Sequence, residues 1–345
     1  MTHSLVLVAN AGDGSLSLFR FDGAALERLS VTGGLTGCST FAVDSTRDLV
    51  YAAVKGDPAG IVTLSLDRAA GVLTEVSRRD LPRGGMNYLA LTHDGGVLLG
   101  ASYGGGYGIL STVADGVVSA PVSEIAYANL HAVLPDASGR FAYFVSLGDD
   151  LVAQYAITDE PSLEPLSPPT VAFPPGIGPR HLALNAAEDS VYVLTEFSAE
   201  IVRLHRDRQT GVLVLDGSTA AHDVAVGLPL GVFGGNPTVN PALWGADLHW
   251  GAGQKHLWAS ERSTSSLAAV PVAADGSLRP AETFTLTEPQ PRGFALSADG
   301  RYLVAAGERS TTVSLYAVDG QHLELLQRAE TGGGANWVRF IEPRP

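Results

Sequence analysis

The stretches Phe41-Ala-Val-Asp44 and Leu49-Val-Tyr-Ala-Ala53 decide the fold of this chain of 345 residues. Each is a short apolar run typical of a β-strand, and a polar turn separates the two. The pair recurs as Leu89-Ala-Leu-Thr92 with Val97-Leu-Leu-Gly-Ala101, Ala132-Val-Leu-Pro135 with Phe141-Ala-Tyr-Phe-Val145, Leu182-Ala-Leu-Asn185 with Val191-Tyr-Val-Leu194, Leu248-His-Trp-Gly251 with His256-Leu-Trp-Ala-Ser260, and Phe294-Ala-Leu-Ser297 with Tyr302-Leu-Val-Ala-Ala306.

The spacing of these copies indicates the size of the repeating unit. Equivalent positions lie 48, 44, 49, 66 and 45 residues apart, counted through Tyr51, Leu99, Tyr143, Tyr192, Trp258 and Leu303. Four of the five intervals suit a four-stranded propeller blade with its turns. The longest interval contains extra Gly- and Pro-rich chain, and we predict that residues 220–245 form a loop at the mouth of the central channel.

The two ends of the chain supply a seventh copy. Leu5-Val-Leu-Val-Ala-Asn10 resembles the second strand of a blade without its first, and Asn336-Trp-Val-Arg-Phe340 resembles a first strand without its second. Joining them closes a ring and leaves no sheet edge exposed. The sequence therefore predicts an all-β chain whose residues 1–345 form a single seven-bladed β-propeller domain. Two β-sandwiches would leave the complementary ends unexplained.

Composition excludes several classes of function. Hydrophobic residues make up 45% of the chain, and a net charge of −14 repels nucleic acid and anionic membranes. Cys38 is the single cysteine, so neither an intrachain disulfide nor a Cys-based zinc site can form. The apolar run near the N-terminus is too short for a signal peptide or a membrane span. We expect a soluble cytoplasmic protein, monomeric or a weak homodimer.

Polar residues gather at one end of the predicted blades. The first strands begin with one position occupied by Ser39, Asn87, Leu130, Arg180, Ala246, Arg292 and Asn336. The next position holds Thr40, Tyr88, His131, His181, Asp247, Gly293 and Trp337. The second strands end at Asn10, Lys55, Tyr103, Leu147, Glu196, Arg262 and Gly307. Antiparallel pairing brings all three positions to the same mouth of the channel.

Two interpretations of this mouth remain open. Arg180 with Glu196, and Asp247 with Arg262, could be ion pairs that tie neighbouring strands or blades together. Charged groups in a desolvated mouth are costly unless they are paired or used. The cationic and imidazole groups, however, outnumber the carboxylates available to them. Such a surplus suits an anionic ligand or a developing oxyanion.

Other motifs are weaker. The glycine-rich stretch 103–108 is followed by no predicted helix, so we interpret it as a turn rather than a phosphate-binding loop. His131, His181, Asp247 and His249 could be drawn as a metal site, but we expect His249 to point away from Asp247 and predict no metal. The chain has no Gly-x-Ser-x-Gly elbow, which argues against an α/β-type serine hydrolase.

The mouth residues lie in stretches that resemble the 6-phosphogluconolactonase family of seven-bladed propellers, which includes fungal carboxymuconate cyclases. The similar stretches are Gly178-Pro-Arg-His181, Glu196, Trp244-Gly-Ala-Asp-Leu-His249, Glu261-Arg-Ser263, Thr287-Glu-Pro-Gln-Pro-Arg-Gly-Phe294 and Gly300-Arg-Tyr-Leu-Val-Ala-Ala-Gly307. The resemblance implies an active centre of His131, Arg180, Glu196 and Arg262, without metal or organic cofactor. Bacterial members of the family tend to have arginine where this chain has Leu243, and the stretch 224–241 is longer here.

We therefore predict a lactonase that hydrolyses a small anionic sugar lactone, with 6-phosphogluconolactone the first candidate. The predicted catalytic residues are His131, Glu196, Arg180 and Arg262. The predicted substrate-binding residues are Arg292, His181, Asp247, Asn87, Asn336 and Lys55. A muconate-type cyclase or isomerase, a non-catalytic binding scaffold and a metal-dependent sugar lactonase are the alternatives.

Overall fold

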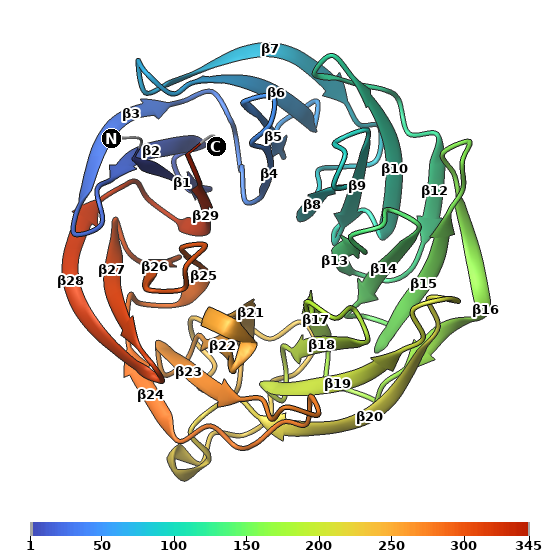
Figure 1. The fold of residues 1–345 in the computed structure, drawn as a ribbon, viewed down its shortest axis with the longest axis vertical. Helices are drawn as coiled ribbons and strands as arrows, with labels where there is room; N and C mark the ends of the chain where they lie inside the picture. Colours follow the sequence, from blue (N-terminus) through green and yellow to red (C-terminus); the bar gives the residue numbers. More distant parts are fainter. Residues whose placement is uncertain (1–2, 344–345) are drawn as a thin grey trace.

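The structure is a computed structural model that describes residues 3–343. Its strands form seven sheets arranged around a central channel (Figure 1). The prediction of an all-β seven-bladed propeller is confirmed, and helix is limited to the short 3₁₀ turns η1 (Val224–Val226) and η2 (Ala252–Gln254) among the described residues. No helix in the described range is long and apolar enough to cross a membrane.

The first sheet joins the two ends of the chain. Its order is β29-β1-β2-β3, formed by Ala335–Ile341, Ser4–Asn10, Ser15–Phe21 and Leu26–Thr32. Val8 of β1 lies opposite Val338 of β29 in an antiparallel register. Figure 1 shows the blue and red ends of the chain side by side in this blade. The ring is therefore closed as predicted.

The next three sheets follow in chain order. The second is β4-β5-β6-β7, formed by Phe41–Asp44, Leu49–Val54, Gly60–Asp67 and Val72–Asp80. The third contains β8 to β12, formed by Tyr88–Leu91, Val97–Ser102, Tyr107–Ala114, Val117–Val118 and Ser123–Ala126, and both of its last strands pair with β10. The fourth is β13-β14-β15-β16, formed by Leu130–Pro135, Phe141–Ser146, Leu151–Ile157 and Leu163–Ala172.

Three further sheets complete the ring. The fifth is β17-β18-β19-β20, formed by Pro179–Leu184, Ser190–Thr195, Glu200–Arg206 and Leu213–Ala220. The sixth is β21-β22-β23-β24, formed by Gly245–Trp250, His256–Glu261, Ser266–Pro271 and Thr283–Leu286. The seventh is β25-β26-β27-β28, formed by Pro291–Leu296, Tyr302–Gly307, Thr312–Asp319 and His322–Glu330.

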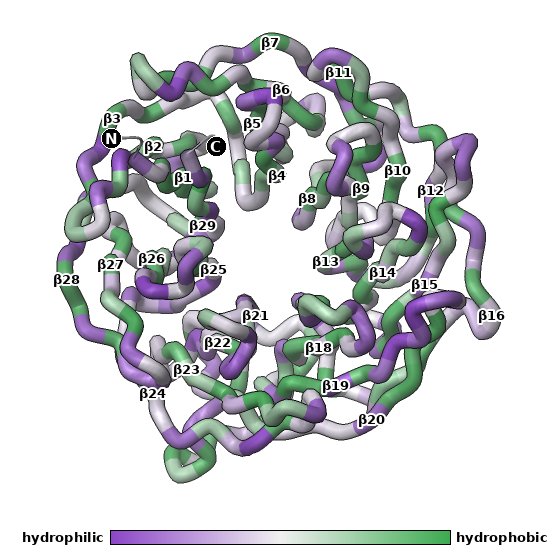
Figure 2. Tube along the Cα trace, in the orientation of Figure 1, coloured by the Kyte–Doolittle hydropathy of each residue, from purple (hydrophilic) through white to green (hydrophobic). Residues whose placement is uncertain are grey.

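Burial falls from the inside of each blade to its outside. The second strands, such as β9 and β14, are buried along their whole length, whereas the outer strand β28 is mostly exposed. Aliphatic and aromatic side chains on both faces of each sheet pack against the neighbouring blades, and in Figure 2 hydrophilic segments gather at turns. Burial on both faces explains why the apolar runs are continuous rather than alternating. The packed blades thus form a rigid frame around the channel.

Candidate active site

β-Bulges aim the polar side chains at the mouth of the channel. The register of the first strand shifts at Leu130/Ala132 in β13, at Pro179/His181 in β17 and at Pro291/Gly293 in β25. Similar register shifts occur at Gly245/Leu248 near the start of β21 and at Ala9/Asn10 in the pair of β1 with β29. A bulge places one extra residue in a strand and redirects its side chain. The extra residues include His131, Arg180, Asp247, Arg292 and Asn336.

Glu196 joins two arginines from neighbouring blades. Its Oε2 accepts from Nε of Arg180 at 2.8 Å, and its Oε1 accepts from Nη2 of Arg262 at 2.6 Å. Arg262 also lies 5.7 Å from the ring centroid of Trp244. The expected Arg180–Glu196 pair is therefore present, whereas Arg262 pairs with Glu196 and not with Asp247. The carboxylate holds both guanidinium groups in one place.

Asp247 joins two histidines instead of an arginine. Its Oδ1 lies 2.7 Å from Nδ1 of His181, and its Oδ2 lies 3.0 Å from Nε2 of His249. The prediction that His249 points away from Asp247 is wrong. Residues two apart on a strand point to the same face, so Asp247 and His249 can meet. Asp247 and His181 are both almost fully buried.

His131 stands beside this group without a hydrogen-bond partner among the described residues. Its ring centroid lies 5.1 Å from that of His181 and 5.9 Å from that of Tyr103. His131 is 5% exposed, and its Nδ1 is buried and unpaired. Buried polar atoms of Ser39, Thr40 and Asn336 at the same mouth are also unpaired. Four of the nine unpaired buried polar atoms in the described structure therefore belong to this mouth, and because buried polar groups are normally paired, the mouth is a candidate place for a ligand.

Electrostatics keep His131 neutral and Glu196 ionised. Burial, reinforced by Arg180, lowers the pKa of His131 well below 6.5. Burial alone would raise the pKa of Glu196, but Arg262 and Arg180 outweigh it and the pKa lies below its ordinary value. Burial also lowers the pKa of Arg180 to about 9, although Glu196 opposes that shift. At neutral pH the mouth therefore contains a free imidazole beside charged guanidinium groups.

The structure brings six of the ten predicted site residues to the lining of one cavity. This lining consists of Ser39, Asn87, His131, Arg180, His181, Arg292, Asn336 and Trp337. Three predicted residues do not line this cavity but bond to it from outside. Glu196 bonds the lining residue Arg180, and Arg262 bonds Glu196. Asp247 bonds the lining residue His181. Lys55 is exposed and does not line the cavity. Desolvation and the charge of Arg292 nevertheless lower the pKa of Lys55 to about 8.

The mouth also contains three residues that the sequence analysis did not predict as site residues. Ser39 and Trp337 line the cavity, and the ring of Tyr103 contacts His131. Each stands at one of the strand-end positions compared around the ring, but none carries a charge that would have marked it as a site residue. Their place in the structure shows that they belong to the mouth.

The insert between β20 and β21 is anchored next to Glu196. The amide of Gly231 donates to the carbonyl of Phe197 at 2.8 Å, and the Gln290 side chain donates to the carbonyl of Pro237 at 3.0 Å. Large apolar side chains of the insert are 51–70% exposed, namely Val224, Val226, Leu230, Val232, Phe233 and Val239. The placement of this loop at the mouth of the channel stays a prediction.

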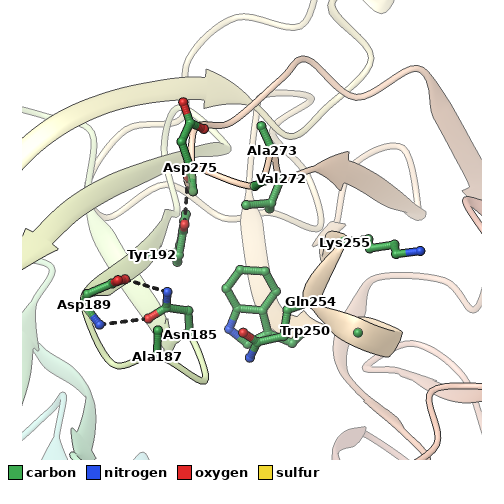
Figure 3. A pocket seen from close by; sticks show the side chains of 13 residues that line it. Asn185, Ala187, Asp189, Tyr192, Trp250, Gln254, Lys255, Val272, Ala273 and Asp275 are labelled. Carbon is green, nitrogen blue, oxygen red and sulfur yellow. Dashed lines mark hydrogen bonds between the residues drawn. The ribbon is translucent and has the colours of Figure 1, made fainter.

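A wider cavity, of about 520 Å³, lies at the other end of β17 and β21 (Figure 3). Its polar side chains mostly stabilise turns: Asn185 bonds Asp189 at 2.7 Å, and the Tyr192 hydroxyl donates to the carbonyl of Gly276 at 2.8 Å. No histidine or arginine lines it. Volume alone favours this cavity, but the predicted histidines and arginines line the mouth cavity instead. Within residues 3–343, no group of three or more His, Cys, Asp or Glu side chains is arranged to hold a metal ion.

Known proteins resemble this chain in sequence, and solved structures resemble it in fold. The 6-phosphogluconolactonase of Sodalis glossinidius is 28% identical over 286 residues, covering 82% of each chain. That of Serratia proteamaculans is 27% identical over 329 residues, covering 93% of each. Among solved structures, the periplasmic gluconolactonase of Pseudomonas aeruginosa superposes with a TM-score of 0.85 at 24% identity, covering 99% of both chains. A Lactobacillus plantarum protein does so with a TM-score of 0.86 at 21% identity, covering 99% of this chain and 100% of its own.

The family comparison covers nearly the whole chain. Residues 6–340 match the family described as "Lactonase, 7-bladed beta-propeller". This match includes most of both closing strands and all the predicted site residues. The chain therefore belongs to the seven-bladed β-propeller lactonase family.

Proposed function

We propose that this lactonase hydrolyses a sugar lactone by general-base attack of water, with 6-phosphogluconolactone as the first candidate. The observation that carries the proposal is the buried, unpaired imidazole of His131 beside the Arg180–Glu196–Arg262 group. The names of the relatives from Sodalis glossinidius and Serratia proteamaculans support the choice of substrate.

His131 is the proposed base. Its neutral ring takes a proton from water as the water oxygen attacks the lactone carbonyl carbon. The carbonyl electrons move onto oxygen, forming a tetrahedral oxyanion. When the carbonyl re-forms, the ring C–O bond breaks and the leaving oxygen takes the proton back from His131. The product is an open-chain hydroxy acid, and no metal ion takes part.

Arg180 and Arg262 are the proposed electrostatic partners. Each keeps N–H groups that have no partner among the described residues, so each can donate to the oxyanion or to an anionic group of the substrate. Both oxygens of Glu196 accept from these arginines, and its lowered pKa keeps it ionised. We therefore assign Glu196 to holding the two guanidinium groups, and His131 to proton transfer.

Arg292 and Lys55 are proposed to attract the charged end of the substrate. Arg292 lines the mouth cavity and pairs with Glu308 at 2.8 Å, which leaves part of its guanidinium exposed. Leu243, which stands where bacterial members of the family tend to have arginine, is a buried aliphatic residue and supplies no cation. Whether phosphate is required thus depends on these two cations.

A lactone-opening assay tests the proposal directly. The substrates are freshly prepared 6-phosphogluconolactone and unphosphorylated gluconolactone, each measured with and without EDTA. We expect hydrolysis of at least one lactone at a rate that EDTA does not change. Loss of activity with EDTA would contradict the metal-independent mechanism. Turnover of muconate-type dicarboxylates with no lactone hydrolysis would support the alternative hypothesis of a cyclase or isomerase.

A further inference from the structure

A chain of hydrogen bonds runs from Asp247 through His181 to Arg180. Oδ1 of Asp247 lies 2.7 Å from Nδ1 of His181, and Nε2 of the same ring lies 3.2 Å from Nη1 of Arg180. The three residues are 2%, 3% and 1% exposed. Water therefore has little access to these contacts, and the geometry of the ring is set by its protein partners.

The contacts of Asp247 determine which nitrogen of His181 carries the proton. Asp247 accepts from the amides of Leu248 at 2.9 Å and Phe294 at 3.2 Å, in addition to the two histidines. An acceptor with so many donors remains a carboxylate. Burial would raise its pKa, but His249 and His181 outweigh that effect and hold the pKa well below 3.8. Nδ1 of His181 must then be the donor, and its Nε2 has a free lone pair.

Arg180 uses that lone pair. One hydrogen of its Nη1 is directed to Nε2 of His181 and the other to the carbonyl of Ala246, while its Nε donates to Glu196. Nη2 has no partner among the described residues. The guanidinium is thus fixed on three sides and keeps one amino group free.

We propose that His181 is a positioning residue, held by Asp247 in its Nδ1–H form so that its Nε2 orients the Arg180 guanidinium toward the substrate. This proposal rests on the role given to Arg180 under the proposed function. It assigns His181 and Asp247 to holding Arg180 and not to contacting the substrate. Both oxygens of Asp247 are already taken, which agrees with that assignment.

Two substitutions of His181 should differ in their effect on kcat/KM. His181→Asn keeps a donor near the Nδ1 position but offers Arg180 no acceptor. His181→Gln can place a carbonyl oxygen near the Nε2 position. We expect kcat/KM to fall at least about tenfold in His181→Asn and to be partly restored in His181→Gln. A residue that only fills space would lose stability in both variants without this difference.

Nitrogen NMR of ¹⁵N-labelled protein tests the holding of Arg180 without any lactone. The groups facing His181 are Asp247 and His249 of β21, Arg180 of β17, His131 of β13 and Tyr88 of β8. We expect a neutral Nδ1–H ring at neutral pH, with its signal identified by its loss in His181→Asn. We also expect hydrogen exchange at Nε of Arg180 to accelerate at least about tenfold in that variant.

Each outcome decides a separate point. An Nε2–H ring in the wild-type protein, or unchanged exchange at Arg180, would overturn the proposal whatever the activity. The expected NMR result with unaltered kcat/KM in His181→Asn would overturn the positioning role. If the wild-type protein opens no lactone, the proposed function fails, while NMR still decides whether His181 holds Arg180. Asp136→Asn, in a buried ion pair at the other end of the channel, is the control for general destabilisation.

Discussion

The two ends of strand β13 carry buried titratable groups in opposite situations. At its start His131 has no hydrogen-bond partner in the described structure. Just beyond its end, Asp136 accepts from Nη2 of Arg206 at 2.8 Å, from the Ser138 hydroxyl and from two backbone amides. Arg206 also donates to the Tyr143 hydroxyl at 2.6 Å and to the Glu188 carbonyl at 2.7 Å.

The difference separates a group whose hydrogen bonds are complete within the protein from a group whose polar atoms are left unpaired. Around Arg206 every type of guanidinium nitrogen has an acceptor, so the group fixes the fourth blade to the fifth and needs nothing more. At the mouth, donors and acceptors remain unpaired although burial is just as deep. Leaving buried polar groups unpaired costs about 1–3 kcal/mol each. Such a cost is typical of sites that a ligand completes.

The largest expected effect comes from His131→Ala. Removal of the base should lower kcat at least about 100-fold, because water must then lose its proton without a positioned acceptor. The change creates no unpaired partner, so the thermal midpoint should stay close to that of the wild-type protein. Steady-state kinetics and thermal unfolding measure the two quantities. Near wild-type turnover would remove His131 from proton transfer.

Arg180→Lys should have the next largest effect. Lysine keeps the charge but cannot reach Glu196, His181 and the Ala246 carbonyl at the same time as presenting a free donor. We expect kcat/KM to fall about 100-fold. Kinetics with the best lactone measure this loss. An unaltered kcat/KM would show that Arg180 does not stabilise charge in the transition state.

The pH profile should change little across the neutral range. His131 accepts a proton only while its ring is neutral, and burial and Arg180 place its pKa well below 6.5. Activity is therefore present above that lowered pKa and is lost as the pH falls through it. We expect kcat/KM to be level from about pH 6.5 to just below pH 8 and to fall at higher pH, because the pKa of Lys55 is lowered to about 8 and that of Arg180 to about 9. A half-maximal point at or above pH 6.5 would indicate a base in a different environment.

Asp136→Asn should leave catalysis unchanged and reduce stability. Removing the charge opposite Arg206 breaks a buried ion pair, which costs about 3 kcal/mol in the free energy of unfolding. Denaturant unfolding measures this cost, and kcat/KM is measured at a temperature where the variant is folded. A loss of kcat/KM comparable with that of Arg180→Lys would erase the distinction between the two ends of β13.

Much of the fold could be predicted because its signal is local and repeated. Two apolar runs and a turn identify each blade, and the incomplete copies at residues 5–10 and 336–340 predicted how the ring closes. The gathering of His131, Arg180 and Glu196 followed from antiparallel pairing alone.

The partners within the site could not be predicted in the same way. The bulges that redirect Arg180 and Asp247 have no signature in a single sequence, so the strand pattern did not show which side chains meet. Arg262 bonds Glu196 across a blade boundary, and Asp247 bonds His181. These choices depend on distances between blades. The wrong orientation expected for His249 has a different cause, because Asp247 and His249 are two residues apart on one strand and the alternation of side chains already places them on the same face.

The pairing of β29 with β1 has a consequence for biosynthesis. β29 follows every other strand in the chain. The edge of β1 that pairs with β29 therefore stays unpaired until the strands of the other six blades have been made. Asn336 reaches the mouth on that final strand. A nascent chain therefore cannot assemble the complete lining of the mouth cavity before the ring has been sealed.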